Sequence, residues 1–193
     1  MRIGILTLLW RRYALTELVL GYYSGLSIPG INFELVAVGS EKKTSRSIAE
    51  DAGWDYVEYP NKPFLDKWNA GARAFRDREI DGLIVLGSDD IFDERYFEWA
   101  ARQLTVDRDY VSQRSLYFYR LGENEAFYSN ELRTGAGRII GRSVLEALDY
   151  EPWDNGRNRS ADASMGKRCE AIAENAFTLD DSREIYTGID LKT

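Results

Sequence analysis

The stretch DGLIVLGSDDIF (residues 81–92) decides how the fold is interpreted. Residues 82–87 are apolar or glycine and suit a buried strand, and the run ends abruptly at Ser88, Asp89 and Asp90. Two neighbouring carboxylates repel each other, so a structural role alone explains the pair poorly. Hard divalent cations such as Mg²⁺ and Mn²⁺ prefer clustered oxygen ligands. The stretch therefore predicts a core strand whose carboxyl end carries a metal-binding pair, Asp89 and Asp90.

Helix capping is the alternative explanation for these carboxylates. Asp90 or Asp93 could cap a helix expected over residues 93–104, because a carboxylate readily accepts hydrogen bonds from the first free N–H groups of a helix. Capping accounts for one carboxylate and leaves its neighbour unexplained. Metal binding is the favoured interpretation.

The composition excludes several classes of chemistry. The chain has 193 residues, is 44% hydrophobic and carries a net charge of -7, which fits one folded domain and argues against a general nucleic-acid coat. It contains no histidine, so Ser-His-Asp and Cys-His catalysis are excluded. The one cysteine, Cys169, lies in a helical pattern and is expected to be an inert thiol in a reducing compartment.

The first residues, MRIGILTLLWRR (1–12), contain a short apolar run that is followed, and not preceded, by basic residues. This order is unlike that of a signal peptide, and the run is too short to span a bilayer. A buried first strand is expected instead. We predict a cytoplasmic protein without stable membrane insertion.

Strand and helix patterns alternate through the first half of the chain. Strands are expected over 2–9, 33–40, 54–60 and 81–88, and helices over 11–26, 44–53, 63–78 and 93–104. The second half is expected to hold a hairpin or mixed strand pair over 109–121 and 125–130, helices over 141–150 and 158–174, and one or two last strands within 176–193. The pattern predicts a single α/β domain over 1–193, with a mostly parallel sheet between helices and a small antiparallel extension in the second half.

Ligands of open α/β sheets bind at the carboxyl ends of the strands. Here the first four expected strands end at Thr7, at GSEK (39–42), at YPNKP (59–63) and at GSDD (87–90). All four ends are polar and would face one cleft. Residues 1–104 are therefore predicted to form the ligand-binding half.

Two later segments are also candidates. GAGRIIG (135–141) has glycine spacing near that of a dinucleotide fingerprint but lacks the preceding strand, so a glycine-rich loop close to a ligand is expected instead. In PWDNGRNRSADASMGKRC (152–169), Trp153 could be a stacking platform for a sugar or base, and Asp162 a catalytic base. A solvated loop with Ser160 or Asp162 as helix cap is an equally good interpretation.

Together these motifs resemble the GT-A-fold glycosyltransferases, nearest to the inverting family 2 type, over about residues 1–170. TLLWRRYALTELVL is similar to the family's first strand and arginine-containing helix, VAVGSEKKTS to its second strand end, and KWNAGARAF to its Asn-x-Gly helix start. LGSDDIF looks like the Asp-x-Asp strand end, with Gly87 at the usual first aspartate. TGAGRIIGRSVLEAL resembles the acceptor-side segment, and NRSADASMGKR the segment that carries the catalytic base.

The resemblance implies a metal-dependent transfer of a sugar from a nucleoside-diphosphate sugar to an acceptor hydroxyl, with inversion. Asp162 takes the role of base, with Asp154 or Glu131 as substitutes, and Asp89 and Asp90 hold Mn²⁺ or Mg²⁺. The donor-binding residues it implies are Thr7, Arg11, Gly39, Ser40, Glu41, Asn69, Gly71, Ser88 and Asp89. The acceptor side, in residues 105–193, includes Gly137, Arg138 and Trp153.

Many GT-A enzymes use a later histidine as a further metal ligand. This chain has none, so water, a carboxylate or the donor phosphates must complete the shell. The acceptor stays open between a glycan, a small molecule, a protein and a hydroxylated base in DNA, the last because basic and aromatic residues gather within 133–168.

Two other functions fit the same fold. A sugar nucleotidyltransferase would need a glycine-rich basic loop after the first strand, and TLLWRRYA has the arginines but no glycine. A non-catalytic module would bind the nucleotide sugar without transferring it.

Overall fold

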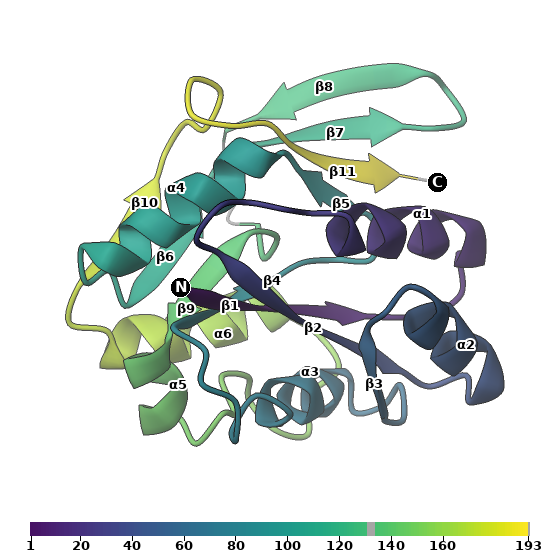
Figure 1. Ribbon diagram of the computed structural model, residues 1–193, viewed down its shortest axis with the longest axis horizontal. Helices are drawn as coiled ribbons and strands as arrows, with labels where there is room; N and C mark the ends of the chain where they lie inside the picture. Colours follow the sequence, from purple (N-terminus) through teal and green to yellow (C-terminus); the bar gives the residue numbers. More distant parts are fainter. Residues whose placement is uncertain (131–133, 193) are drawn as a thin grey trace.

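The computed structural model describes residues 1–130 and 134–192, which form two β-sheets and six α-helices (Figure 1). The larger sheet has seven strands in the order β10-β6-β9-β4-β1-β2-β3, and the smaller has four in the order β5-β11-β7-β8. Glu131, an alternative candidate for the base, lies outside the described residues.

The first half of the chain builds the parallel part of the large sheet. Its elements are β1 (Arg2–Leu8), α1 (Tyr13–Ser24), β2 (Asn32–Gly39), α2 (Lys43–Asp51), β3 (Asp55–Glu58), α3 (Phe64–Arg73), β4 (Gly82–Val85) and α4 (Glu94–Thr105). β1 pairs in parallel with β2 and β4, and β2 with β3. The predicted mostly parallel sheet is confirmed.

Helices cover both faces of this sheet, so successive residues of β1 point into two different cores. Ile3 and Ile5 pack with residues of α1 and α4, whereas Leu6 and Leu8 pack with residues of α3, α5 and α6. In Figure 1, α1 and α4 accordingly lie above the sheet, and α3 and α5 below it. Burial on both faces explains why the central strands read as continuous apolar runs.

The second half completes the large sheet with β6 (Tyr110–Gln113), β9 (Arg138–Gly141) and β10 (Ala176–Leu179), and adds α5 (Arg142–Ala147) and α6 (Ala161–Ile172). β9 lies antiparallel between β4 and β6. The expectation of a glycine-rich loop over 135–141 was therefore wrong for 138–141. Ile139 and Ile140 are fully buried there, because the strand fills the middle of the sheet.

The small sheet consists of β5 (Asp90–Phe92), β7 (Leu116–Arg120), β8 (Glu125–Ser129) and β11 (Gly188–Lys192). The predicted hairpin is present as the β7–β8 pair. The strand expected over 109–121, however, divides into β6 and β7, which belong to different sheets. β11 pairs with β7 in parallel and with β5 in antiparallel fashion, so the C-terminal strand returns to the segment that follows β4.

None of the helices in residues 1–130 and 134–192 combines the length and the apolar character needed to cross a membrane.

Gly71 allows α3 to approach the sheet closely. A Cβ atom at this position would lie 2.4 Å from Cδ1 of Leu6 and 2.6 Å from Cγ2 of Val38. Gly71 therefore serves the contact between helix and sheet in this structure, and not a surface open to a donor.

We expect Gly71→Val to lower the free energy of unfolding by roughly 1–3 kcal/mol, because the added carbons overpack the core. Gly21→Ala is the matched control, since a Cβ at Gly21 of α1 meets nothing within 4 Å. That control should be neutral or stabilising by up to about 1 kcal/mol. Urea denaturation measures both, and an unchanged Gly71→Val protein would contradict this account of the packing.

Candidate active site

Three carboxylates meet just beyond the carboxyl end of β4. Asp89, Asp90 and Asp190 each place one oxygen so that the three atoms lie within 4.8 Å of one another. The register of β5 and β11 pairs Asp190 directly with Asp90, and the amide of Leu191 donates to the carbonyl of Asp89 at 2.8 Å. The C-terminal strand thus supplies a third carboxylate that the sequence did not reveal.

The cluster is poorly solvated and strongly negative. Asp90 is 4% exposed, and the side chains of Asp89 and Asp190 are each 13% exposed. Burial, followed by the charges of Asp190 and Asp89, raises the pKa of Asp90 to about 8. Burial also raises the pKa of Asp190. The three groups therefore need positive charge beside them to be ionised together.

A divalent cation fits this donor set. The ligand atoms are hard carboxylate oxygens, and Oδ1 of Asp190 is buried without a hydrogen-bond partner in the described part of the chain. An orphaned buried acceptor is costly unless something binds it. Asp89, Asp90 and Asp190 are thus the residues that would hold Mg²⁺ or Mn²⁺.

Two basic side chains already lie against the cluster. A guanidinium nitrogen of Arg12 is 2.6 Å from Oδ2 of Asp89, and Nζ of Lys192 is 2.5 Å from Asp190 and 3.9 Å from Asp89. Neither residue was singled out from the sequence for this role. Both offset part of the negative charge that a bound cation would otherwise have to balance alone.

Arg12, and not Arg11, reaches the carboxylates. Both arginines have positive φ (57° and 50°) and stand just before α1. The guanidinium of Arg11 lies 4.6 Å from the ring centroid of Trp10, and its backbone N–H donates to Glu41 at 2.8 Å.

α1 fixes the backbone that carries the carboxylates. The hydroxyl of Tyr23 donates to the carbonyl of Asp90 at 2.8 Å and accepts from the amide of Phe92 at 3.1 Å. Gly87 is needed on the other side, because a Cβ there would lie 2.8 Å from an oxygen of Asp89 and an oxygen of Asp90. An aspartate at 87, the position of the usual first aspartate in the resemblance, would not fit this geometry.

The cluster and Asp162 line the same cavity of about 190 Å³. Asp162 lies in the first turn of α6, and no described residue donates a hydrogen bond to its carboxylate. Gly135 allows it to lie against the backbone, since a Cβ at 135 would be 2.0 Å from Oδ1 of Asp162. The side chain is therefore not used to cap α6 by hydrogen bonding among the described residues.

A larger cavity of about 940 Å³ shares Ala161 and Asp162 with the smaller one. Arg138 lines the larger cavity although it is only 3% exposed, and it donates to the carbonyls of Thr134 at 2.9 Å and Asp162 at 2.5 Å. Arg138 thereby joins β9 to the start of α6. Asp162 thus lines both cavities.

Gly137 lies inside the fold. Its φ of 68° favours glycine, its carbonyl accepts from the hydroxyl of Tyr96 at 3.0 Å, and a Cβ would lie 2.7 Å from Cζ of Phe92. The structure therefore places Gly137 in the packing between the sheets, away from an acceptor surface.

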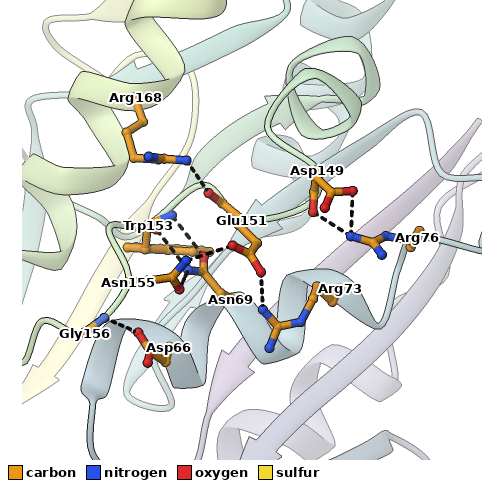
Figure 2. A network of polar contacts seen from close by, with 10 residues as sticks. All are labelled: Asp66, Asn69, Arg73, Arg76, Asp149, Glu151, Trp153, Asn155, Gly156 and Arg168. Carbon is orange, nitrogen blue, oxygen red and sulfur yellow. Dashed lines mark hydrogen bonds and ion pairs between the residues drawn. The ribbon is translucent and has the colours of Figure 1, made fainter.

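Asn69 and Trp153 are buried against each other (Figure 2). Nδ2 of Asn69 donates to the Trp153 carbonyl at 2.9 Å, and its Oδ1 accepts from the Trp153 amide at 3.0 Å. The Trp153 ring, 1% exposed, stacks on Trp68 with the ring centroids 5.2 Å apart. Asn69 thus holds the loop before α6 against α3 by hydrogen bonds and does not face an open donor site. Trp153 supports the cavity wall, and the expectation of an accessible stacking platform was wrong.

The remaining donor-side candidates divide into two groups. Glu41 accepts from the amide of Arg11 and from the hydroxyl of Tyr13 at 3.0 Å, and Ser40 donates to Asn61 at 2.7 Å, so these residues lie among the strand-end loops. Three others are enclosed: Thr7 is 2% exposed, Ser88 is 5% exposed, and a Cβ at Gly39 would lie 2.5 Å from Cβ of Ser45.

The fold is mixed α/β, with a mostly parallel central sheet between helices and a second, smaller sheet, and it matches solved structures of S. aureus TarS. The chain matches S. aureus TarS residues 1–349 with a TM-score of 0.72, covering 99% of this chain and 60% of that one. The match to the same TarS fragment in complex with UDP-GlcNAc has a TM-score of 0.73 and covers 100% and 59%, and the match to its UDP complex has 0.67 and covers 100% and 61%.

Sequence identity to each of these structures is 12%, so the likeness is one of fold. The chain spans about three fifths of the TarS fragment that it matches. No protein-family model matches the sequence, and no curated protein matches it.

Arg12 and a metal ion would compete for Asp89. We therefore expect Arg12→Met to tighten Mn²⁺ binding without nucleotide by about fivefold, because an ion pair of this kind contributes about 1 kcal/mol. Arg11→Met is the matched control, since it removes the same charge one residue away. Calorimetry with Mn²⁺ measures both affinities. Equal effects of the two substitutions would show that Arg12 does not compete for the site.

Proposed function

We propose that this chain is a metal-dependent glycosyltransferase that moves a sugar from a nucleoside-diphosphate sugar to an acceptor hydroxyl, with inversion. The observation that carries the proposal is the small cavity, which the three carboxylates and Asp162 line together. The structures of TarS with UDP-GlcNAc and with UDP support a uridine-diphosphate sugar as the donor.

Asp89, Asp90 and Asp190 hold the divalent ion, which when bound offsets the charge that gathers on the leaving nucleoside diphosphate. Arg12, just before α1, and Lys192, at the end of β11, add further positive charge beside the ion. Both side chains are about 40–50% exposed, which leaves them free to move from the carboxylates toward a diphosphate. The residues of the chain thus bind and orient the diphosphate end of the donor.

Asp162 takes the proton of the acceptor hydroxyl as the oxygen attacks the anomeric carbon. Inversion requires this base on the face opposite the leaving group, and Asp162 is a carboxylate that lines the same cavity as the cluster. Arg138 and Gly135 fix its place, the first through the Asp162 carbonyl and the second by leaving room for its carboxylate.

The acceptor enters through the larger cavity. Its volume of about 940 Å³ lies within the range of ligand pockets, and Asp162 lines both this cavity and the smaller one. Serine, alanine and glycine make up much of its lining, together with Phe64 and the charged Lys167 and Glu170. Such a lining suits a hydroxyl-rich acceptor such as a glycan.

Asp162→Asn tests the role of the base. We expect kcat for transfer from UDP-GlcNAc to fall by about 10²- to 10⁴-fold, because the hydroxyl proton loses its acceptor, while UDP binding with Mn²⁺ is unchanged. The measurement is UDP release with a panel of glycan acceptors. A pyrophosphate assay with nucleoside triphosphate and sugar phosphate in parallel detects nucleotidyl transfer instead.

Asp154→Asn is the matched control for this experiment. Asp154 already pairs with Arg157 at 3.1 Å and with Arg168 at 3.7 Å, so its carboxylate is engaged elsewhere. It should keep wild-type kcat. Near wild-type transfer by Asp162→Asn, or loss of transfer in Asp154→Asn alone, would contradict the assignment.

A further inference from the structure

Lys67 is a buried lysine that the proposed reaction does not use. It lies in α3 and is 1% exposed. Its Nζ donates to the carbonyl of Leu9 at 2.8 Å and to Oδ1 of Asn61 at 2.7 Å, and it lies 3.4 Å from Oγ of Ser40. An ammonium group has three N–H donors, so these contacts use all of them.

Each of the three partners belongs to a different strand end. Leu9 follows β1, Ser40 follows β2, and Asn61 lies in the loop after β3. These loops form the edge of the sheet at which ligands of open α/β folds bind. Ser40 also donates to Asn61 at 2.7 Å, so the loops after β2 and β3 are joined twice. One ammonium therefore holds three otherwise separate loops together.

This arrangement is costly for the folded protein. No carboxylate of the described residues lies within 4.0 Å of the ammonium, and burial lowers the pKa of Lys67 from 10.5 to about 8, with Glu41 opposing the shift. A charge without an ion-pair partner contributes little net stability when it is buried. A role in fixing the loops accounts for the position better than a role in overall stability does.

We propose that Lys67 is a positioning residue for the donor: it holds the loops after β1, β2 and β3 in the arrangement that receives the nucleoside end of the nucleotide sugar. This inference rests on the proposed function for the identity of the ligand. Lys67 acts through the loops, since all three of its N–H groups already donate to Leu9, Ser40 and Asn61 and none is left for the ligand itself.

Lys67→Met tests the proposal, because methionine keeps much of the apolar stem and removes the ammonium. Lys43→Met is the matched control, since Lys43 is exposed and lies in α2, outside the three loops. Asn61→Ala is a second variant, which removes one acceptor and keeps the lysine. It tests the same contact if Lys67→Met does not fold.

We expect Lys67→Met to weaken UDP binding in the presence of Mn²⁺ at least tenfold and to raise the KM for UDP-GlcNAc similarly, with kcat changed less than threefold. Asn61→Ala should weaken UDP binding at least threefold, and Lys43→Met should leave it unchanged. Hydrogen exchange should speed up in residues 9–12, 40–42 and 59–62 of the Lys67 variant but not in 90–92 and 188–192. A purely structural role would lower the free energy of unfolding and leave the KM unchanged.

Wild-type UDP affinity in folded Lys67→Met, or in Asn61→Ala if the lysine variant does not fold, would overturn the proposal. Unchanged hydrogen exchange in the three loops would overturn it as well. Failure of the proposed function gives a different result, because the wild-type protein itself would then bind no UDP with Mn²⁺. In that case the exchange data alone decide whether Lys67 holds the loops together.

Discussion

Repulsion among Asp89, Asp90 and Asp190 is the constraint to which the rest of the site responds. Their oxygens lie within 4.8 Å of one another in a largely buried position, which raises the pKa of Asp90 to about 8. Such a cluster persists only when the fold holds the backbone rigidly and supplies positive charge. Arg12 and Lys192 supply part of that charge, and the orphaned oxygen of Asp190 leaves a place for a cation.

Three elements of the fold hold the backbone around the cluster in place. β4 ends beneath the cluster, β11 returns from the C-terminus to pair Asp190 with Asp90, and Tyr23 of α1 binds the backbone of β5. The two sheets are thereby joined at the point where the charges meet. In the lining of the small cavity, Arg138 and Gly135 fix Asp162: Arg138 donates to its backbone carbonyl, and Gly135 leaves room for its carboxylate.

Local sequence patterns were sufficient to predict the parallel strands, because strands buried on both faces appear in the sequence as continuous apolar runs. They failed for β9, whose four residues follow a glycine-rich turn and gain their strand identity only from β4 and β6 on either side. Asp89 and Asp90 were found because they follow an apolar run directly. Asp190 was not found, since only the long-range register of β5 and β11 brings it to them.

The contacts of other candidate residues could not be predicted for similar reasons. Sequence does not show that Arg12, and not Arg11, forms the ion pair with Asp89. Asn69 and Trp153 are polar or aromatic residues in plausible loops, yet they satisfy each other inside the fold. Lys67 carried no signal at all, because the three loops that it joins are distant in sequence.

Anomalous diffraction from crystals soaked with Mn²⁺ and UDP tests the central claim most directly. The account predicts a manganese peak in contact with oxygens of Asp89, Asp90 and Asp190, with the Arg12 guanidinium moved away from Asp89. UDP bound at the strand-end loops with no manganese at the three carboxylates, and with the Arg12–Asp89 ion pair intact, would contradict it.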